Sequence, residues 1–309
     1  MNYRHAYHAG NFADVLKHLT LALVIEHLKR KEAPFRVIDT HAGRGRYALD
    51  STHAIKTGEW RGGIGRVLGP DAKPLPDAVA QVMAPYLDVV RAENPAPELT
   101  VYPGSPAIAQ RLMRQADVLV ANELHPEDAL ALKAAMGRDR RVKMLALDGW
   151  MTLKSLLPPN ERRGVVLIDP PFEEEGELER LFEGLVAAWR RFETGVYLAW
   201  YPIKDPRPVA DLHAALAGTQ GPELLRVELM IRGGNAPDRL NGCGLIVANP
   251  PFTLRDQLDA ALPTLTQRLA EGSGARHRLD NLVRTAVSGP APSGASKGPA
   301  RARKPAQKR

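Results

Sequence analysis

The sequence predicts an α/β protein in which helices cover both faces of a mostly parallel, doubly wound sheet. Two observations support this fold class. From residue 35 onward, short apolar segments alternate with longer segments of helical periodicity, which is typical of βαβ units. The segment 164–168 is entirely apolar after its glycine, as expected for a strand buried on both faces. Asp169 follows it, and two prolines end the strand because proline cannot donate to a neighbouring strand.

The composition limits the class of protein. The 309 residues are enough for a large core. Cys243 is the single cysteine, so we expect a reducing cytoplasm and neither a disulfide framework nor a zinc cluster. The N-terminus lacks the apolar core of a signal peptide, and the apolar residues 19–28 are too few to span a membrane. We therefore expect a cytoplasmic protein without membrane contact.

The basic excess is concentrated at the C-terminus. The formal net charge is +7, and residues 288–309 contain six basic side chains and no acid. A segment rich in Pro, Gly, Ala and Ser cannot form a core, so we expect residues 279–309 to be a disordered basic tail. Such a tail could add salt-sensitive affinity for a polyanion, or it could only keep the protein soluble.

The first expected helix covers residues 11–30, whose apolar side chains approximate the period of an amphipathic helix. Asn11 is its expected N-cap, and Asp14 lies three residues later, as in a loose capping box. Before the helix, residues 3–8 gather aromatic and basic side chains. We assign residues 1–47 to an N-terminal segment and the start of the main domain.

A glycine-bearing turn follows the first expected strand. Residues 35–39 form that strand, and residues 40–47 contain two glycines, which let a backbone approach a ligand closely. The glycine spacing does not match the dinucleotide-binding fingerprint, and no P-loop sequence follows. Residues 48–98 are rich in Gly and Pro and break the strand–helix alternation. We expect a small helical insertion there, with helices near residues 74–93.

The alternation then resumes, and we assign residues 99–278 to the rest of the main domain. Two late strands, residues 224–231 and 244–248, have little helix between them, which predicts an antiparallel pair at the sheet edge. Further strands are expected at residues 99–102, 118–123, 142–149 and 196–200, and a helix at residues 178–192.

Acidic side chains follow four of the expected strands: Asp39, Glu123, Asp148 and Asp169. Each alone could be a helix N-cap, but together they line the edge where open α/β sheets bind ligands. The Glu123 carboxylate can accept two hydrogen bonds from a ribose. Asp148 can accept one from an adenine amino group, and Gly149 leaves room for the ring. An adenosine site without phosphate-binding signals indicates S-adenosylmethionine as the cofactor.

The turn Asp169-Pro170-Pro171-Phe172 fits the acceptor of a methyl group. The exocyclic amine of adenine is a poor nucleophile because its lone pair is delocalised into the ring. Hydrogen bonds from this amine to the Asp169 carboxylate and the Pro170 carbonyl would free the lone pair, and Asp169 could also act as a general base. Phe172 offers a face for the base, which has to leave its stack first.

These motifs resemble those of the class I S-adenosylmethionine-dependent methyltransferases that modify amino nitrogens. The similarity is greatest to the bacterial RlmJ family, which methylates N6 of an adenine in 23S ribosomal RNA, and extends to about residue 275. The matching segments are Tyr3-Arg4-His5, residues 8–11 and 13–18, Asp39-Thr40-His41-Ala42-Gly43, residues 102–106, Glu123-Leu124-His125-Pro126, Asp169-Pro170-Pro171 and Trp200-Tyr201-Pro202.

The resemblance implies roles for individual residues. It implies that Asp169 is catalytic and that Tyr3 contacts the RNA. The family has tyrosine at the position of Phe172, so stacking is kept but a hydroxyl is lost. The resemblance also implies a Rossmann-like class I methyltransferase fold and a cofactor site lined by His18, His41, Ser105, Glu123, Asp148, Gly149 and Asp169.

A second copy of the motif, Asn249-Pro250-Pro251-Phe252, also follows an apolar strand. We favour Asp169, because its strand is the fourth and should lie beside the first, whereas Asn249 ends the last strand and no helix is expected after it. Two rival functions remain: a DNA adenine methyltransferase, and a non-catalytic RNA-binding protein. We expect a monomer that acts on naked or partly assembled 23S ribosomal RNA and needs no metal.

Overall fold

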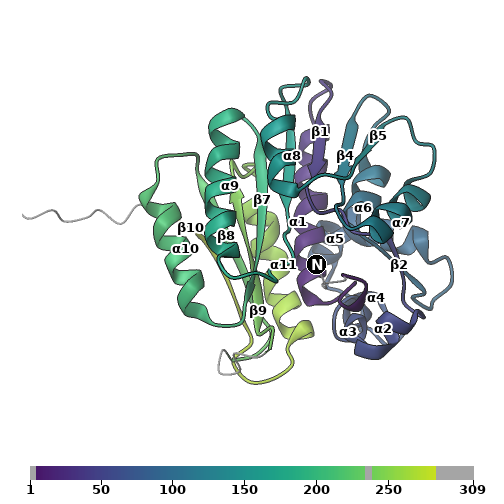
Figure 1. Ribbon diagram of the computed structural model, residues 1–309. Coiled ribbons are helices and arrows are strands. Elements are labelled where there is room, and N and C mark those ends of the chain that lie inside the picture. The colour runs from purple at the N-terminus through teal and green to yellow at the C-terminus, as the bar shows by residue number, and fades with distance from the viewer. Residues whose placement is uncertain (1–4, 234–238, 283–309) are drawn as a thin grey trace, which may run out of the picture.

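The computed structural model describes residues 5–233 and 239–282, and within these residues eight strands form one sheet in the order β10-β8-β9-β7-β6-β1-β4-β5 (Figure 1). Its central strand β1 lies between β4 and β6 and is parallel to both. The expected α/β fold class is confirmed. The strands are β1 (Arg36–Asp39), β4 (Val118–Asn122), β5 (Val142–Leu145), β6 (Gly164–Ile168), β7 (Val196–Ile203), β8 (Leu224–Met230), β9 (Gly242–Ala248) and β10 (Arg276–Asn281).

The sheet has a parallel half and an antiparallel half. Strands β5, β4, β1, β6 and β7 are parallel to one another. Strand β9 is antiparallel to both β7 and β8, and β10 is antiparallel to β8. The edge therefore holds three late strands and not the expected pair. Residues 279–281, which we expected to begin the tail, belong to β10, and residues 283–309 lie outside the described residues.

One expected strand lies outside the large sheet. Residues 101–103 form β3 (Val101–Pro103), which pairs antiparallel with β2 (Arg46–Ala48). The apolar pattern of residues 99–102 is that of a strand, but its partner is the segment just after the glycine turn. The carboxyl end of β3 is thereby carried back toward the end of β1.

Helices cover both faces of the sheet, and alternate residues of β6 point to the two sides. Val165 and Leu167 join one hydrophobic cluster, with α1, α5, α6 and α11, whereas Val166 and Ile168 join another, with α8, α9 and α10. The helices are α1 (Phe12–Lys29), α2 (Thr52–Thr57), α3 (Glu59–Gly62), α4 (Ile64–Leu68), α5 (Asp77–Glu93), α6 (Ser105–Leu112), α7 (Pro126–Met136), α8 (Gly149–Leu156), α9 (Glu177–Arg191), α10 (Pro206–Gly218) and α11 (Leu254–Leu269).

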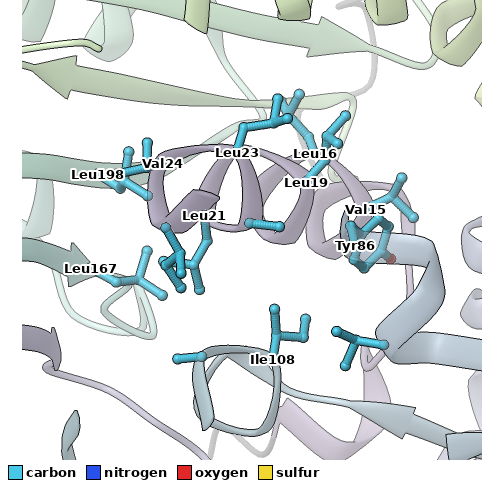
Figure 2. Close-up of a cluster of buried hydrophobic side chains, with 14 of the residues drawn as sticks. Val15, Leu16, Leu19, Leu21, Leu23, Val24, Tyr86, Ile108, Leu167 and Leu198 are labelled. Carbon is cyan, nitrogen blue, oxygen red and sulfur yellow. The ribbon is translucent and has the colours of Figure 1, made fainter. Parts of the chain in front are cut away.

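Helix α1 is not amphipathic, contrary to expectation, because nearly its whole surface is buried. It packs on β6, β7 and β9 on one side and is covered by α5, α6 and α11 on the others. Figure 2 shows Leu167 and Leu198 of the sheet, Tyr86 of α5 and Ile108 of α6 around it. The expected insertion is helical and contains α2 to α5, and α5 contributes Met83 and Tyr86 to the main core.

Helix α1 begins where the sequence predicted. Asn11 caps it by accepting hydrogen bonds from the amides of Ala13 and Asp14. Asp14 reaches back to the amide of Gly10, one residue before the cap. None of the helices in the described part of the chain is long and apolar enough to span a membrane.

Candidate active site

The turn after β6 holds Phe172 in an uncommon backbone conformation, with φ of +52°. Its amide donates to Glu177 Oε2 at 3.0 Å, and Glu177 Oε1 accepts from Arg180 Nη1 at 3.1 Å. The Phe172 ring meets Trp200 of β7 edge to face, with centroids 5.6 Å apart. A left-handed backbone is costly for a bulky residue, so these contacts fix the ring beside Asp169.

A buried ammonium connects Asp169 to helix α1. Lys17 Nζ lies 2.5 Å from Asp169 Oδ2 and 2.9 Å from Asp14 Oδ1, and its side chain is only 4% exposed. Asp14 also accepts from His5 Nε2 at 3.0 Å. Burial lowers the pKa of Lys17, but the carboxylates of Asp14 and Asp169 outweigh it and raise the pKa well above its usual value. Lys17 is therefore a permanent cation that occupies one oxygen of Asp169.

His18, the next residue of the helix, faces the same region but is neutral. Its Nδ1 lies 2.7 Å from the Tyr102 hydroxyl, which is 3.0 Å from the hydroxyl of Tyr86. Burial lowers the pKa of His18 to about 3, although Asp14 opposes this shift. His18 can therefore offer a fixed, uncharged polar edge to a ligand.

A cavity of about 260 Å³ opens at the carboxyl ends of β1, β4, β5 and β6. Its wall includes Lys17 and Trp150 together with the whole predicted cofactor set. The predicted residues are far apart in the sequence. Those after β1, β4, β5 and β6 meet because parallel strands end at one edge of the sheet, and His18 of α1 and Ser105 of α6 join them there. The whole predicted set lines the wall. Its members are His18, His41, Ser105, Glu123, Asp148, Gly149 and Asp169.

The residues after β4 and β1 shape one side of this cavity. Glu123 Oε2 accepts from the Gly43 amide at 2.8 Å, and its Oε1 accepts from the His125 amide at 2.8 Å. Burial raises the pKa of Glu123. Gly43 has a φ of +60°, and a Cβ there would lie 2.1 Å from the Tyr47 hydroxyl. The glycine turn thus brings a backbone N–H to the carboxylate.

The residues after β5 shape the other side. Asp148 Oδ1 caps α8 by accepting from the amides of Trp150 and Met151, so one of its oxygens serves the helix. A Cβ on Gly149 would lie 2.4 Å from Nε2 of His41. Burial lowers the pKa of His41 to about 4. Gly149 therefore leaves room for the His41 ring, which lines the cavity.

Asp39 lies beneath this cavity and not on its wall. Ser105, the first residue of α6, donates its hydroxyl to Asp39 Oδ2 at 2.6 Å. Burial raises the pKa of Asp39 to about 7, although the Ser105 hydrogen bond opposes the shift. Asp39 thus orients Ser105, which does reach the cavity.

A second cavity, of about 760 Å³, lies on the other side of Asp169. Phe172 and Trp200 line it, and it shares His5, Lys17 and Asp169 with the first cavity. The Lys17 ammonium is 5.8 Å from the centre of the Trp200 ring. Tyr3, predicted to contact the substrate, lies outside the described residues.

Sequence reasoning missed Lys17, Trp150 and Glu177 as parts of this site. Lys17 had a readable signal, because Asp14 three residues earlier lies on the same helix face. Trp150 directly follows Gly149, and its ring lies 6.0 Å from that of His41. Glu177 had no signal, because its bond to the Phe172 amide depends on how α9 meets the turn.

The second copy of the motif lies at the opposite edge of the sheet. Asn249 follows β9, which runs antiparallel to β7, and its Nδ2 donates to the carbonyl oxygens of Glu193 and Gly195. Contrary to expectation, helix α11 follows this turn. Among the described residues, no group of His, Cys, Asp and Glu side chains is arranged to hold a metal ion.

The position of β1 between β4 and β6, the acid after β4 and the Asp-Pro-Pro-Phe turn after β6 define a Rossmann-like methyltransferase of class I. Comparison with known proteins identifies the family. The family model described as ribosomal RNA large subunit methyltransferase D, RlmJ, matches residues 32–281. The chain belongs to this RlmJ family.

Individual relatives agree with this assignment. Ribosomal RNA large subunit methyltransferase J of Escherichia coli is 40% identical over 269 residues, which are 87% of this chain and 94% of the relative. The protein of the same name from Haemophilus influenzae is 39% identical over 276 residues, 89% and 96% of the two chains. A crystal structure of a Legionella pneumophila protein is 32% identical, with a TM-score of 0.80, and covers 88% of this chain and 98% of that one.

Proposed function

We propose that this protein transfers a methyl group from S-adenosylmethionine to N6 of a specific adenine in 23S ribosomal RNA. The observation that carries the proposal is that two cavities meet at the Asp169 carboxylate. One is lined by the predicted cofactor residues and the other by aromatic rings. A methyl donor and a base can thus approach the same carboxylate from opposite sides.

The first cavity suits S-adenosylmethionine in shape and charge. Gly149 lets the His41 ring pack against the start of α8, and His41 and Trp150 line the part of the cavity proposed for the adenine ring. The Glu123 carboxylate can accept hydrogen bonds from the ribose hydroxyls. The second oxygen of Asp148, Oδ2, can accept a hydrogen bond from the adenine amine. His18, Ser105 and Asp169 complete the proposed site. When bound, the cofactor supplies an electrophilic methyl group on a sulfonium cation, which the surrounding carboxylates favour.

Asp169 and Pro170 prepare the acceptor. Lys17 occupies Asp169 Oδ2, which leaves Oδ1 to accept a hydrogen bond from the adenine amine. The Pro170 carbonyl accepts the second N–H, so the nitrogen lone pair is no longer drawn into the ring. Asp169 takes the proton that the amine loses as the new N–C bond forms. Phe172 stacks on the base, a contact that contributes roughly 1–3 kcal/mol.

The substrate has to present its adenine outside a helical stack, because Asp169 lies 14% exposed between two cavities. We therefore favour naked or partly assembled 23S ribosomal RNA, in which the base is free to flip. The resemblance implies that Tyr3 contacts this RNA, and we include that contact in the proposal. Such a substrate locates the reaction in the cytoplasm, and we propose that a monomer carries it out.

The test combines binding with mapping of the product. S-Adenosylmethionine is titrated into the purified protein by calorimetry, and protein-free 23S ribosomal RNA from cells that lack the enzyme is then used as acceptor. We expect one bound cofactor and one N6-methyladenine, located by mass spectrometry of RNA fragments. Absence of cofactor binding would refute the proposed methyltransferase activity. Methylation of duplex DNA in preference to RNA would indicate that the protein is a DNA adenine methyltransferase.

A further inference from the structure

The sheet topology gathers several chain ends on the acceptor side of Asp169. Strands β7 and β8 end at this edge of the sheet, and β9 and β10 begin there, because β9 and β10 run opposite to their neighbours. Figure 1 shows these strands together on one side of the molecule, away from α2, α3 and α4. Side chains just beyond β7 and β8 and just before β9 line the second cavity, and the start of β10 lies at the same edge of the sheet.

Basic side chains are concentrated at these ends. We call the set formed by Lys204, Arg232, Arg239, Arg276 and Arg278 the cationic strip. Lys204 follows β7 and Arg232 lies just beyond β8, and both line the second cavity together with Arg239. Arg276 and Arg278 are the first and third residues of β10 and line a separate cavity on the α10 face of the sheet, which is bounded by Ile203 and Met230.

Not all of this positive charge is neutralised. Arg232 is paired with Glu271, and Arg278 with Asp280 at 3.0 Å. Within the described residues, Lys204 and Arg276 are exposed and have no carboxylate within salt-bridge distance, and Arg276 donates to the carbonyl of Gly274. Two cations are thus free to contact an external anion.

The opposite wall of the second cavity has a different character. It is formed by His8, Asn11, Glu59 and Gly62. The carboxylate of Glu59 lies 3.0 Å from His8 Nδ1 and from Asn11 Nδ2. The remaining lysine of the lining, Lys17, is buried and bonded to two carboxylates. A polyanion that enters this cavity is therefore attracted to the strip side.

We propose that the cationic strip binds the phosphates of the RNA next to the flipped adenine, so that the RNA leaves the cavity over β7 to β10 and not over the helical insertion. This inference rests on the proposed function. From β7 to β10 the strip crosses three strand spacings, about 14 Å. At about 3.4 Å of axial rise per nucleotide, it can contact several phosphates of one strand.

The strip is tested by the salt dependence of RNA binding. The double variant Lys204→Gln/Arg276→Gln is compared with Arg30→Gln/Lys31→Gln, which removes the same charge from exposed positions at the opposite end of α1. The probe is a 23S ribosomal RNA transcript that the wild type methylates. For the strip variant we expect several-fold weaker binding, and a slope of log Kd against log salt that is smaller by about 1 per lost contact.

Controls separate the possible failures. Cofactor affinity is measured for each variant to show that the fold is intact. A third double variant, Lys56→Gln/Arg61→Gln, removes charge from the insertion. The proposed role of the cationic strip is wrong if the strip variant keeps the wild-type slope of log Kd against log salt. It is also wrong if either of the other two double variants shows an equal decrease in that slope. If the wild type itself neither binds nor methylates the transcript, the proposed function fails, and not the strip alone.

Discussion

Two turns of nearly the same sequence, residues 169–172 and 249–252, lie at opposite edges of one sheet and differ in almost every contact. Asp169 follows a strand that runs parallel to β1, so it meets the ends of β1 and β4. Asn249 follows β9, which runs the other way. The direction of the strand, and not the motif, places a turn at the ligand edge.

Their polar and aromatic side chains also have different partners. Asp169 is bonded to a buried lysine and lines two cavities. Asn249 donates both side-chain N–H groups to the carbonyl oxygens of residues 193 and 195. Phe172 is half-buried against Trp200, but Phe252 is 78% exposed, with Arg30 at 5.4 Å from its ring centre. The turn at residues 169–172 therefore has side chains that can reach a ligand, whereas the turn at residues 249–252 has a structural role.

The largest difference between the turns is expected for their first residues. Asp169→Ala should lower kcat by about 10²–10⁴-fold, the usual contribution of a general base. Asn249→Ala should leave kcat unchanged and cost about 1–3 kcal/mol of unfolding free energy, because two carbonyls lose their donor. Steady-state methyl transfer and urea unfolding test the pair. The assignment of Asp169 fails if its variant turns over like the wild type.

The two ends of α1 extend the comparison to stability. Lys17→Met leaves two carboxylates without their shared cation and should cost about 3–5 kcal/mol. Arg30→Met removes an exposed cation beside Phe252 and should cost less than about 1 kcal/mol. Chemical denaturation at neutral pH measures both. Equal losses would contradict the role of Lys17 as a buried link.

The aromatic residues of the turns are expected to differ in substrate recognition. Phe172→Ala should lower kcat/KM for RNA by roughly 1–3 kcal/mol of stacking, about 5- to 150-fold. Its cofactor affinity should not change, because Phe172 does not line the first cavity. Phe252→Ala serves as the matched control and should have wild-type kinetics. Phe172→Tyr should retain activity, since it keeps the ring.

The smallest effect on activity is expected for substitution of Glu177, which accepts a hydrogen bond from the Phe172 amide. Among the described residues, no side chain accepts a corresponding bond from the Phe252 amide. Glu177→Ala should raise KM for RNA about fivefold, because loss of one hydrogen bond of about 1 kcal/mol frees the Phe172 backbone. Glu177→Gln keeps an acceptor and should restore most of this loss. If Gln and Ala behave alike, the ion pair with Arg180 matters and not the turn.

Most of the fold could be read from the sequence, with instructive exceptions. The apolar strands β1 and β4 to β9, the cap at Asn11 and the helix within residues 74–93 were predicted correctly. Helix α1 was taken as amphipathic, because a helix covered on every side differs from a surface helix only in packing. The pairing of β3 with β2 and the presence of β10 depended on long-range contacts that local patterns do not encode. Helix α11 had a readable local signal, because its leucines at 254, 258, 262, 265 and 269 follow the helical period.

The sequence by itself determined which residue types stand at the strand ends, because a strand must stop where prolines or polar turns follow an apolar segment. It also supplied both copies of the Pro-Pro-Phe turn. Only the tertiary structure decided which copy faces a cavity, since that depends on strand direction, and only it joined Lys17 to Asp169, 152 residues apart. A buried charge is tolerated only when its partner is in place, and that partner is chosen by the packing of α1 on the sheet.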